Sequence, residues 1–111
     1  MKQATEPSET THEAVIDPER RICDPHHHLW QRAGQRYLLD ELLADTGSAD
    51  AQGARHNVCS TVYVECASMY RASGPEALRP VGETEFAQGI AAMSASGDFG
   101  PTRVAAGIVS F

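Results

Sequence analysis

The hydrophobic residues of this chain gather in three short, nearly continuous runs, and two segments with helical periodicity lie between them. Apolar runs of about four to eight residues, rich in β-branched side chains, are typical of strands that are covered on both faces of a parallel sheet. The pattern therefore predicts three strands, at Arg21–Leu29, Val58–Cys66 and Arg103–Phe111.

The first segment between these strands predicts a helix at Tyr37–Asp45. Its leucines recur at helical spacing, while Asp40, Glu41 and Asp45 occupy the other side. The tripeptide Thr46–Ser48, with its central glycine, is a typical signal for the end of a helix. The small and polar residues that follow indicate a loop before the second strand.

The second segment predicts a helix from Pro80 to about Ser96. Phe86, Ile90 and Met93 form an apolar stripe along it, which we expect to pack in the core. Glu83, in the first turn, is expected to complement the helix dipole.

Strands and helices thus alternate in the order β, α, β, α, β. This alternation is typical of parallel strands joined by helical crossovers, so we predict an α/β fold with strand order 1-2-3 and both helices on one face of the sheet. Residues 1–20, rich in Thr, Glu, Pro and Ser, are predicted to form a disordered tail before a single domain at residues 21–111.

Length and composition narrow the classes of function. At 111 residues the chain holds at most one small domain. A formal net charge of −6 and a pI near 5.2 argue against nucleic acid and anionic membranes as partners, because no basic patch is present to neutralise phosphates. No apolar run approaches the roughly 20 residues that span a bilayer. The odd number of cysteines (Cys23, Cys59 and Cys66) fits buried, reduced thiols in a cytoplasmic protein.

Three consecutive histidines close the first predicted strand. Because successive side chains of a strand point to opposite faces, Asp24, His26 and His28 are predicted to share one face and His27 to point the other way. Cα atoms two residues apart on a strand lie roughly 6.5–7 Å apart, so both imidazoles can reach one divalent cation at about 2.0–2.1 Å. His26 and His28 are therefore candidate metal ligands, although a His-x-His pair also occurs on surfaces and in satisfied cores.

Other polar residues near the predicted strand ends are candidates for the same site. Asp24 is a candidate acceptor that fixes a histidine tautomer, with capping of a local turn as the alternative. Glu65 places a carboxylate at the C-terminal end of the second strand, where a salt bridge or a solvated loop edge is the alternative. The predicted loop at residues 67–79 carries Tyr70 and Arg71, which face either a substrate or solvent.

With these elements placed, the sequence resembles the N-terminal part of an amidohydrolase-superfamily enzyme, of the amidohydrolase-related subgroup that includes sugar lactonases. The segment Asp24–Trp30 matches the Asp-x-His-x-His motif that this superfamily carries at the end of barrel strand one. The likeness runs from about Ile22 to Phe111. Further support comes from three segments, Tyr37–Leu42, Thr61–Cys66 and Val81–Phe86.

This resemblance implies a (β/α)8 TIM barrel with a mono- or binuclear divalent metal site, whose strand-one ligands would be His26 and His28. The expected metal is zinc, with manganese as an alternative, and some similar lactonases work without a metal. The other ligands and the proton-transferring aspartate would come from later strands, beyond Phe111. Because such a barrel takes about 250 residues, the chain would be an N-terminal fragment with three of the eight βα units.

The resemblance also implies an activity. The parent protein would be a hydrolase that cleaves a lactone, ester or amide of a small-molecule substrate with metal-activated water. A non-oxidative decarboxylase of the same superfamily and a catalytically inactive fragment are the alternatives. We expect residues 1–111 alone to show no turnover and to be poorly soluble or homo-oligomeric, because one sheet face is left uncovered.

Overall fold

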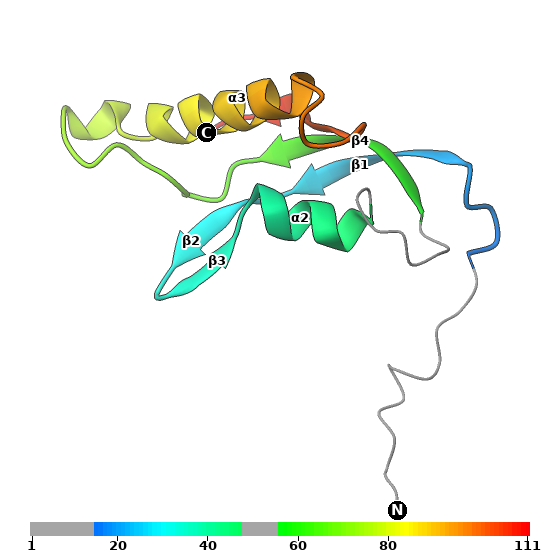
Figure 1. The fold of residues 1–111 in the computed structure, drawn as a ribbon. Coiled ribbons are helices and arrows are strands. Elements are labelled where there is room, and N and C mark those ends of the chain that lie inside the picture. The colour runs from blue at the N-terminus through cyan, green and yellow to red at the C-terminus, as the bar shows by residue number, and fades with distance from the viewer. Residues whose placement is uncertain (1–14, 48–55) are drawn as a thin grey trace, which may run out of the picture.

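A computed structural model describes residues 15–47 and 56–111 (Figure 1). Its centre is a parallel sheet of three strands, β1 (Arg21–His27), β4 (Asn57–Val64) and β5 (Arg103–Val109), in the order β1-β4-β5. The predicted α/β class, the three parallel strands and their order are thereby confirmed. The first strand is shorter than predicted, since it ends at His27 and not at Leu29.

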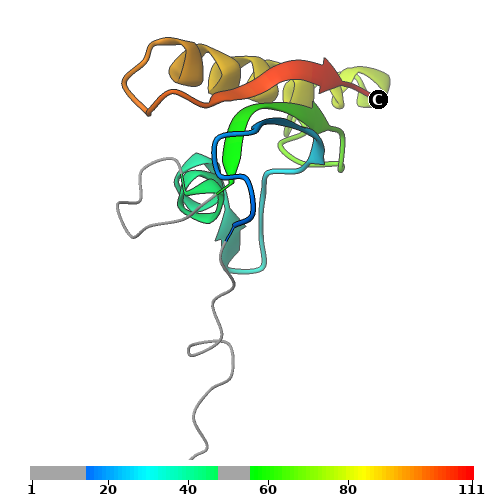
Figure 2. The same ribbon diagram turned by 90° about the vertical axis from the view of Figure 1, so that its right-hand side faces the viewer.

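Two α-helices connect these strands and pack into one core. They are α2 (Leu39–Thr46) and α3 (Val81–Ala95), and a short 3-10 helix, η1 (Glu76–Leu78), precedes α3. Residues of both helices share a single cluster with Tyr63 of β4, which places them on the same face of the sheet (Figures 1 and 2). The buried members of that cluster are Leu29, Leu39, Leu42, Leu43, Tyr63, Ala87, Ile90, Val104 and Ala105.

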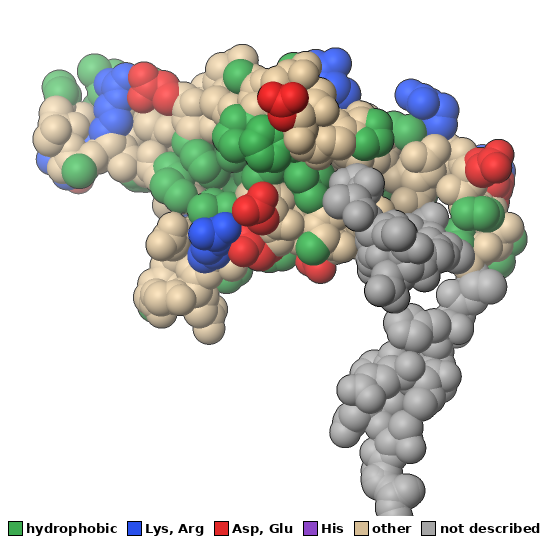
Figure 3. All heavy atoms as spheres, in the orientation of Figure 1, with side chains coloured by type: hydrophobic (Ala, Val, Ile, Leu, Met, Phe, Trp, Pro, Cys, Tyr) green, Lys and Arg blue, Asp and Glu red, His purple; other side chains and the backbone are tan. Residues whose placement is uncertain are grey.

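Hydrophobic side chains follow the seam between α3 and α2 on the face shown in Figure 3. The leucines of α2 are its buried side chains and account for the periodicity of that segment. Over the described ranges, no helix is long and apolar enough to cross a membrane.

Helix α2 begins and ends through local hydrogen bonds. Glu41 Oε1 accepts the backbone N–H of Leu38 at 2.9 Å, which satisfies a donor at the start of the helix. Gly47 adopts the left-handed conformation with φ of 76°, and its N–H donates to the carbonyl of Leu43 at 3.1 Å. The end of the helix predicted from Thr46–Ser48 is thus confirmed.

A hairpin lies between β1 and α2, where the apolar pattern predicts no element. Its strands are β2 (Trp30–Arg32) and β3 (Gln35–Tyr37), paired antiparallel. Ala33 and Gly34 form the turn with φ of 49° and 80°, the pair of positive values that a two-residue type I′ turn requires. The aromatic rings at the two ends of the hairpin stack with centroids 6.4 Å apart.

The buried face of α3 differs from the predicted one. Met93, expected in the core, is 41% exposed, and Phe86 is only partly buried. Ser94 lies on the buried face of α3. Its Oγ donates to the carbonyl of Thr102 at 2.7 Å and accepts the N–H of Val104 at 2.8 Å. The residues that face the sheet are Glu83, Ala87, Ile90 and Ser94.

Most of the predicted tail, residues 1–20, lies outside the described residues. Residues 15–20 form an exposed turn before β1, in which Arg20 Nε donates to Asp17 Oδ2 at 3.2 Å. The carbonyl of Glu19 accepts a hydrogen bond from the Asn57 side chain at 3.1 Å, which ties this turn to the start of β4.

The cysteines are all free thiols, as the sequence predicts. Cys59 and Cys66 are half-buried, whereas Cys23 is exposed. The expectation of buried thiols is therefore wrong for Cys23, which lies on β1, one of the two edge strands of this sheet.

Candidate functional site

A bulge near the carboxyl end of β1 decides which residues share a face. Asp24 aligns with Thr61 of β4, and His27 aligns with Tyr63. Between these two aligned pairs, β1 therefore contains one more residue than β4. Aligned residues of a parallel pair point to the same face, and Thr61 and Tyr63 lie on the face that the helices cover. Asp24 therefore points to the helix-covered face, and the prediction that it shares a face with His26 and His28 is wrong.

His26 and His28 lie side by side at this end of the sheet. Their ring centroids are 5.0 Å apart in an edge-to-face arrangement, with His26 exposed and His28 half-buried. Two imidazoles on one tetrahedral zinc ion, with Zn–N distances of about 2.0–2.1 Å, have ring centroids roughly 5 Å apart. The spacing of the pair therefore fits two ligands of one cation.

A backbone carbonyl fixes the orientation of the His28 ring. Nδ1 of His28 lies 2.8 Å from the carbonyl oxygen of Val64, and because a carbonyl only accepts, Nδ1 is the donor in this contact. In a neutral ring with this proton position, Nε2 is the nitrogen that has a free lone pair. The Val64 carbonyl thus has the orienting role that the sequence predicts for Asp24. Asp24 Oδ1 instead accepts the backbone N–H of His26 at 3.2 Å, which is the turn-capping alternative.

His27 points away from this pair and into the helix-facing core. It is 7% exposed, its ring meets that of Tyr63 edge-on at 5.7 Å, and its Nε2 lies 2.8 Å from Thr61 Oγ1. Burial lowers the pKa of His27, against the opposing effect of the Asp24 carboxylate, so the ring is held neutral at pH 7. His27 therefore has the packing role that strand alternation predicts for it.

Thr61 links all three strands through its hydroxyl group. Besides contacting His27 on β1, its Oγ1 accepts the N–H of Ala105 on β5 at 2.8 Å. Ala105 has a positive φ of 56° and lies in an irregular stretch of β5, where the pairing with β4 shifts register. The hydroxyl thus satisfies a backbone donor that the irregular strand takes out of the ladder.

Glu65 follows β4 directly, next to the carbonyl that holds His28. It is half-buried, and its backbone N–H donates to the carbonyl of Val109 at 2.9 Å. In the parts of the chain that the structure describes, its carboxylate makes no hydrogen bond, and no group of three or more His, Cys, Asp or Glu could hold a metal. Among the described residues, Glu65 is therefore not grouped with the histidine pair in a cluster of three or more candidate ligands.

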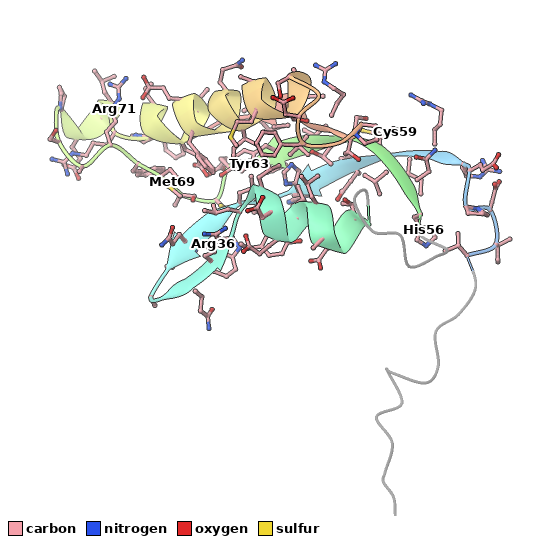
Figure 4. All side chains as sticks on the ribbon, in the orientation of Figure 1. Arg36, His56, Cys59, Tyr63, Met69 and Arg71 are labelled. Atoms are coloured by element: carbon pink, nitrogen blue, oxygen red, sulfur yellow. The ribbon has the colours of Figure 1, made fainter. Side chains whose placement is uncertain are left out.

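Tyr70 and Arg71 follow in the loop between β4 and η1. Tyr70 is 38% exposed. Arg71 forms a bidentate pair with Glu85 of α3, with Nε–Oε1 and Nη2–Oε2 distances of 3.1 Å and 2.9 Å, and lies beside the start of α3 (Figure 4). The guanidinium of Arg71 is thus engaged with the helix, which leaves Tyr70 as the freer of the two candidates.

Glu83 is a buried residue that the sequence places only at a helix start. It is 3% exposed, and its Oε2 accepts three hydrogen bonds: from the Tyr63 hydroxyl at 2.6 Å, the Cys66 N–H at 2.9 Å and the Ser68 N–H at 3.1 Å. Burial raises the pKa of the Glu83 carboxyl, but the hydrogen bonds outweigh it, so the net pKa is lowered. Glu83 is an anionic acceptor beneath the end of β4.

The sequence does contain a signal for this placement. Glu83 precedes Ala87 by four residues and Ile90 by seven, the spacing of a single helix face. A stripe of Glu83, Ala87 and Ile90, in place of the predicted stripe that begins at Phe86, puts Glu83 on the buried side of the helix.

Comparisons with known proteins add no further information about this site. No protein-family model matches the chain, and no curated protein and no solved structure matches it significantly.

Proposed function

We propose that residues 21–111 form the first three βα units of a (β/α)8 barrel and that this barrel is a metal-dependent hydrolase of small lactones, esters or amides. The parallel order of the strands and the packing of both helices on one face support the barrel. The histidine pair lies at the carboxyl end of β1, the end of a barrel at which active sites form. The further ligands and the proton-transferring aspartate belong, in this proposal, to sequence beyond residues 1–111.

The observation that carries the proposal is the pairing of His26 and His28, with the His28 ring oriented by a backbone carbonyl. These two residues would hold the cation. When bound, a divalent cation polarises a substrate carbonyl and lowers the pKa of water to about 7. The contribution of this chain would be orientation, because the Val64 carbonyl accepts the Nδ1 proton of His28 and leaves Nε2 as the nitrogen that would bind the cation.

Equilibrium binding of Zn²⁺ and Mn²⁺, measured by competition with a chromophoric chelator, tests this assignment. The double substitution His26→Ala/His28→Ala should abolish binding, and His27→Ala should leave it in place. His56→Ala is the matched control, since His56 is an exposed histidine at the amino end of β4 (Figure 4). An equal loss in the His27 or His56 variant would contradict the proposal.

The hydrolase itself is tested with lactone, ester and amide substrates, using the longest polypeptide that contains these residues. Hydrolysis should stop when the metal is chelated and return when Zn²⁺ or Mn²⁺ is added. Full activity after chelation, with no metal bound, would count against the proposed mechanism.

A further inference from the structure

We infer that Glu83 is a positioning residue for the histidine pair: from α3 it fixes the backbone at the end of β4, and that backbone orients the His28 ring. The consequence for metal binding rests on the proposed function. The orientation of the ring does not, because the contacts involved are all within this chain.

The Glu83 carboxylate holds the chain on both sides of Val64. The hydroxyl of Tyr63, one residue earlier, and the backbone N–H groups of Cys66 and Ser68, just after, all donate to Oε2. Because Glu83 is buried and anionic, these hydrogen bonds are charge-assisted and little screened by water. One side-chain and two backbone hydrogen bonds to a single atom therefore hold the chain on both sides of the Val64 carbonyl.

The same segment adopts a backbone conformation that needs such support. Ala67 and Met69 have positive φ values of 62° and 58°, in the left-handed region that residues with a side chain rarely enter. Conformations of this kind persist where surrounding contacts over-determine them, and they gather at functional sites. In Figure 4, Tyr63 lies between the sheet and α3, and Met69 lies on the segment that leads from β4 towards η1.

Two further contacts hold this segment from either side. A Cβ on Gly82, at the start of α3, would lie 2.6 Å from the carbonyl oxygen of Met69 and 2.7 Å from the nitrogen of Arg71, so only glycine allows this approach. The guanidinium of Arg32, on the hairpin, donates to the carbonyl of Cys66. Helix α3 and the hairpin thus both hold the segment that follows β4, and Glu83 of α3 makes the buried contacts with it.

The link to the metal ligand is short. Val64, whose carbonyl accepts the Nδ1 proton of His28 at 2.8 Å, lies one residue after Tyr63 and two before Cys66. If Glu83 no longer accepts from these neighbours, the strand end relaxes and the carbonyl turns away from His28. The imidazole then loses the acceptor that selects one tautomer, although Glu83 never touches the ring.

The substitution Glu83→Gln, with Glu85→Gln as control, tests this inference in the metal-free chain. Glu85 receives the same chemical change two residues along α3, but it is exposed and pairs with Arg71. Long-range ¹H–¹⁵N spectra of the imidazoles should show His28 with its proton on Nδ1 in the wild type and in the control, and a mixture of tautomers in Glu83→Gln. A purely structural role for Glu83 would lower stability without changing the tautomer.

Amide hydrogen exchange gives a second reading on the same samples. The amides of Cys66 and Ser68 should exchange at least about tenfold faster in Glu83→Gln than in Glu85→Gln, because their acceptor is weakened. If Glu83→Gln does not fold, Glu83→Asp carries the test. It keeps the charge on a shorter side chain, and it should give a partial tautomer mixture.

Zinc affinity then separates this inference from the proposed function. Glu83→Gln should weaken Zn²⁺ binding about tenfold, the lower end of the effect of residues that orient ligands, and Glu85→Gln should not. If the wild type binds no zinc, the proposed function fails and the tautomer still decides the role of Glu83. A folded Glu83→Gln or Glu83→Asp protein with His28 still protonated only on Nδ1, and with unchanged amide exchange, would overturn the inference.

Discussion

Three consecutive histidines divide between two sides of the same sheet. On the helix-facing side, His27 is 7% exposed, bonded to Thr61 and held neutral by burial. On the other side, the rings of His26 and His28 meet edge to face, His26 is exposed, and His28 bonds to the backbone carbonyl of Val64. Identical side chains thus differ in role because of the side of the strand from which each one emerges.

The comparison extends to the residues around them. The helix-facing side is fixed by buried polar side chains, above all Thr61, Glu83 and Ser94, each bonded to backbone groups of a neighbouring element. The opposite side leaves imidazole nitrogens available to a ligand. In our proposal, the helix-facing side of these strand ends maintains the structure and positions the opposite side, which would bind the metal.

The largest expected change in the free energy of unfolding comes from Thr61→Val, on the helix-facing side of the sheet. The substitution keeps the shape but leaves His27 and the Ala105 N–H without their shared partner. Two orphaned buried groups should lower the free energy of unfolding by about 3 kcal/mol in urea denaturation. Thr84→Val, on the half-buried surface of α3, is the control, with an expected change below about 0.5 kcal/mol. A loss no larger in Thr61→Val than in the control would remove the structural half of the comparison.

A smaller effect is expected from adding one methyl group at Gly82. Its new Cβ would meet backbone atoms, which cannot move aside as a side chain can, so Gly82→Ala should destabilise the fold by about 2 kcal/mol. Gly89, on the same helix, has nothing within 4 Å of the position that a Cβ would occupy. Gly89→Ala should therefore stabilise by about 0.5–1 kcal/mol. In thermal melts, the midpoint should fall for Gly82→Ala and rise for Gly89→Ala. Shifts of the same sign in both variants would contradict the close approach of the backbone to Gly82.

The smallest expected effect is the part of the stability loss at low pH that is due to the Glu83 carboxyl group. Its folded-state pKa lies below the ordinary value of 4.5, so the folded form binds this proton less readily than the unfolded chain. The stabilisation is therefore present above the unfolded pKa and is lost as the pH falls through the lowered folded pKa. Urea midpoints measured between about pH 7 and pH 3 should fall less steeply for Glu83→Gln than for the wild type, which keeps this carboxylate. Parallel curves would contradict the role of the buried carboxylate.

The strands and helices could be predicted because their signals are local. The apolar run around Tyr63 and the leucines of α2 each fit one period, and the alternation of elements then dictates a parallel sheet. The hairpin could not be predicted, because its strands have three residues each and its turn depends on Ala33 adopting a positive φ. An alanine carries no turn signal.

The candidate site was predictable only in part, for a similar reason. The neighbouring positions of His26 and His28 follow from the strand period, and the structure brings their rings together. The bulge that separates Asp24 from them depends on pairing with β4, a strand more than thirty residues away, and so leaves no local pattern. The hydrogen bonds of Glu83 likewise join α3 to the end of β4 and need the folded structure to be seen.

The most direct test of the two-sided account is a zinc titration of the wild-type chain, followed in the imidazole ¹⁵N resonances of all three histidines. The account predicts that the Nε2 resonance of His28 and the ring resonances of His26 shift together as zinc is added. Those of His27 should remain at the position of a neutral, buried ring. A zinc-dependent shift of His27, or a shift of only one member of the pair, would contradict the division of the three histidines between structure and metal binding.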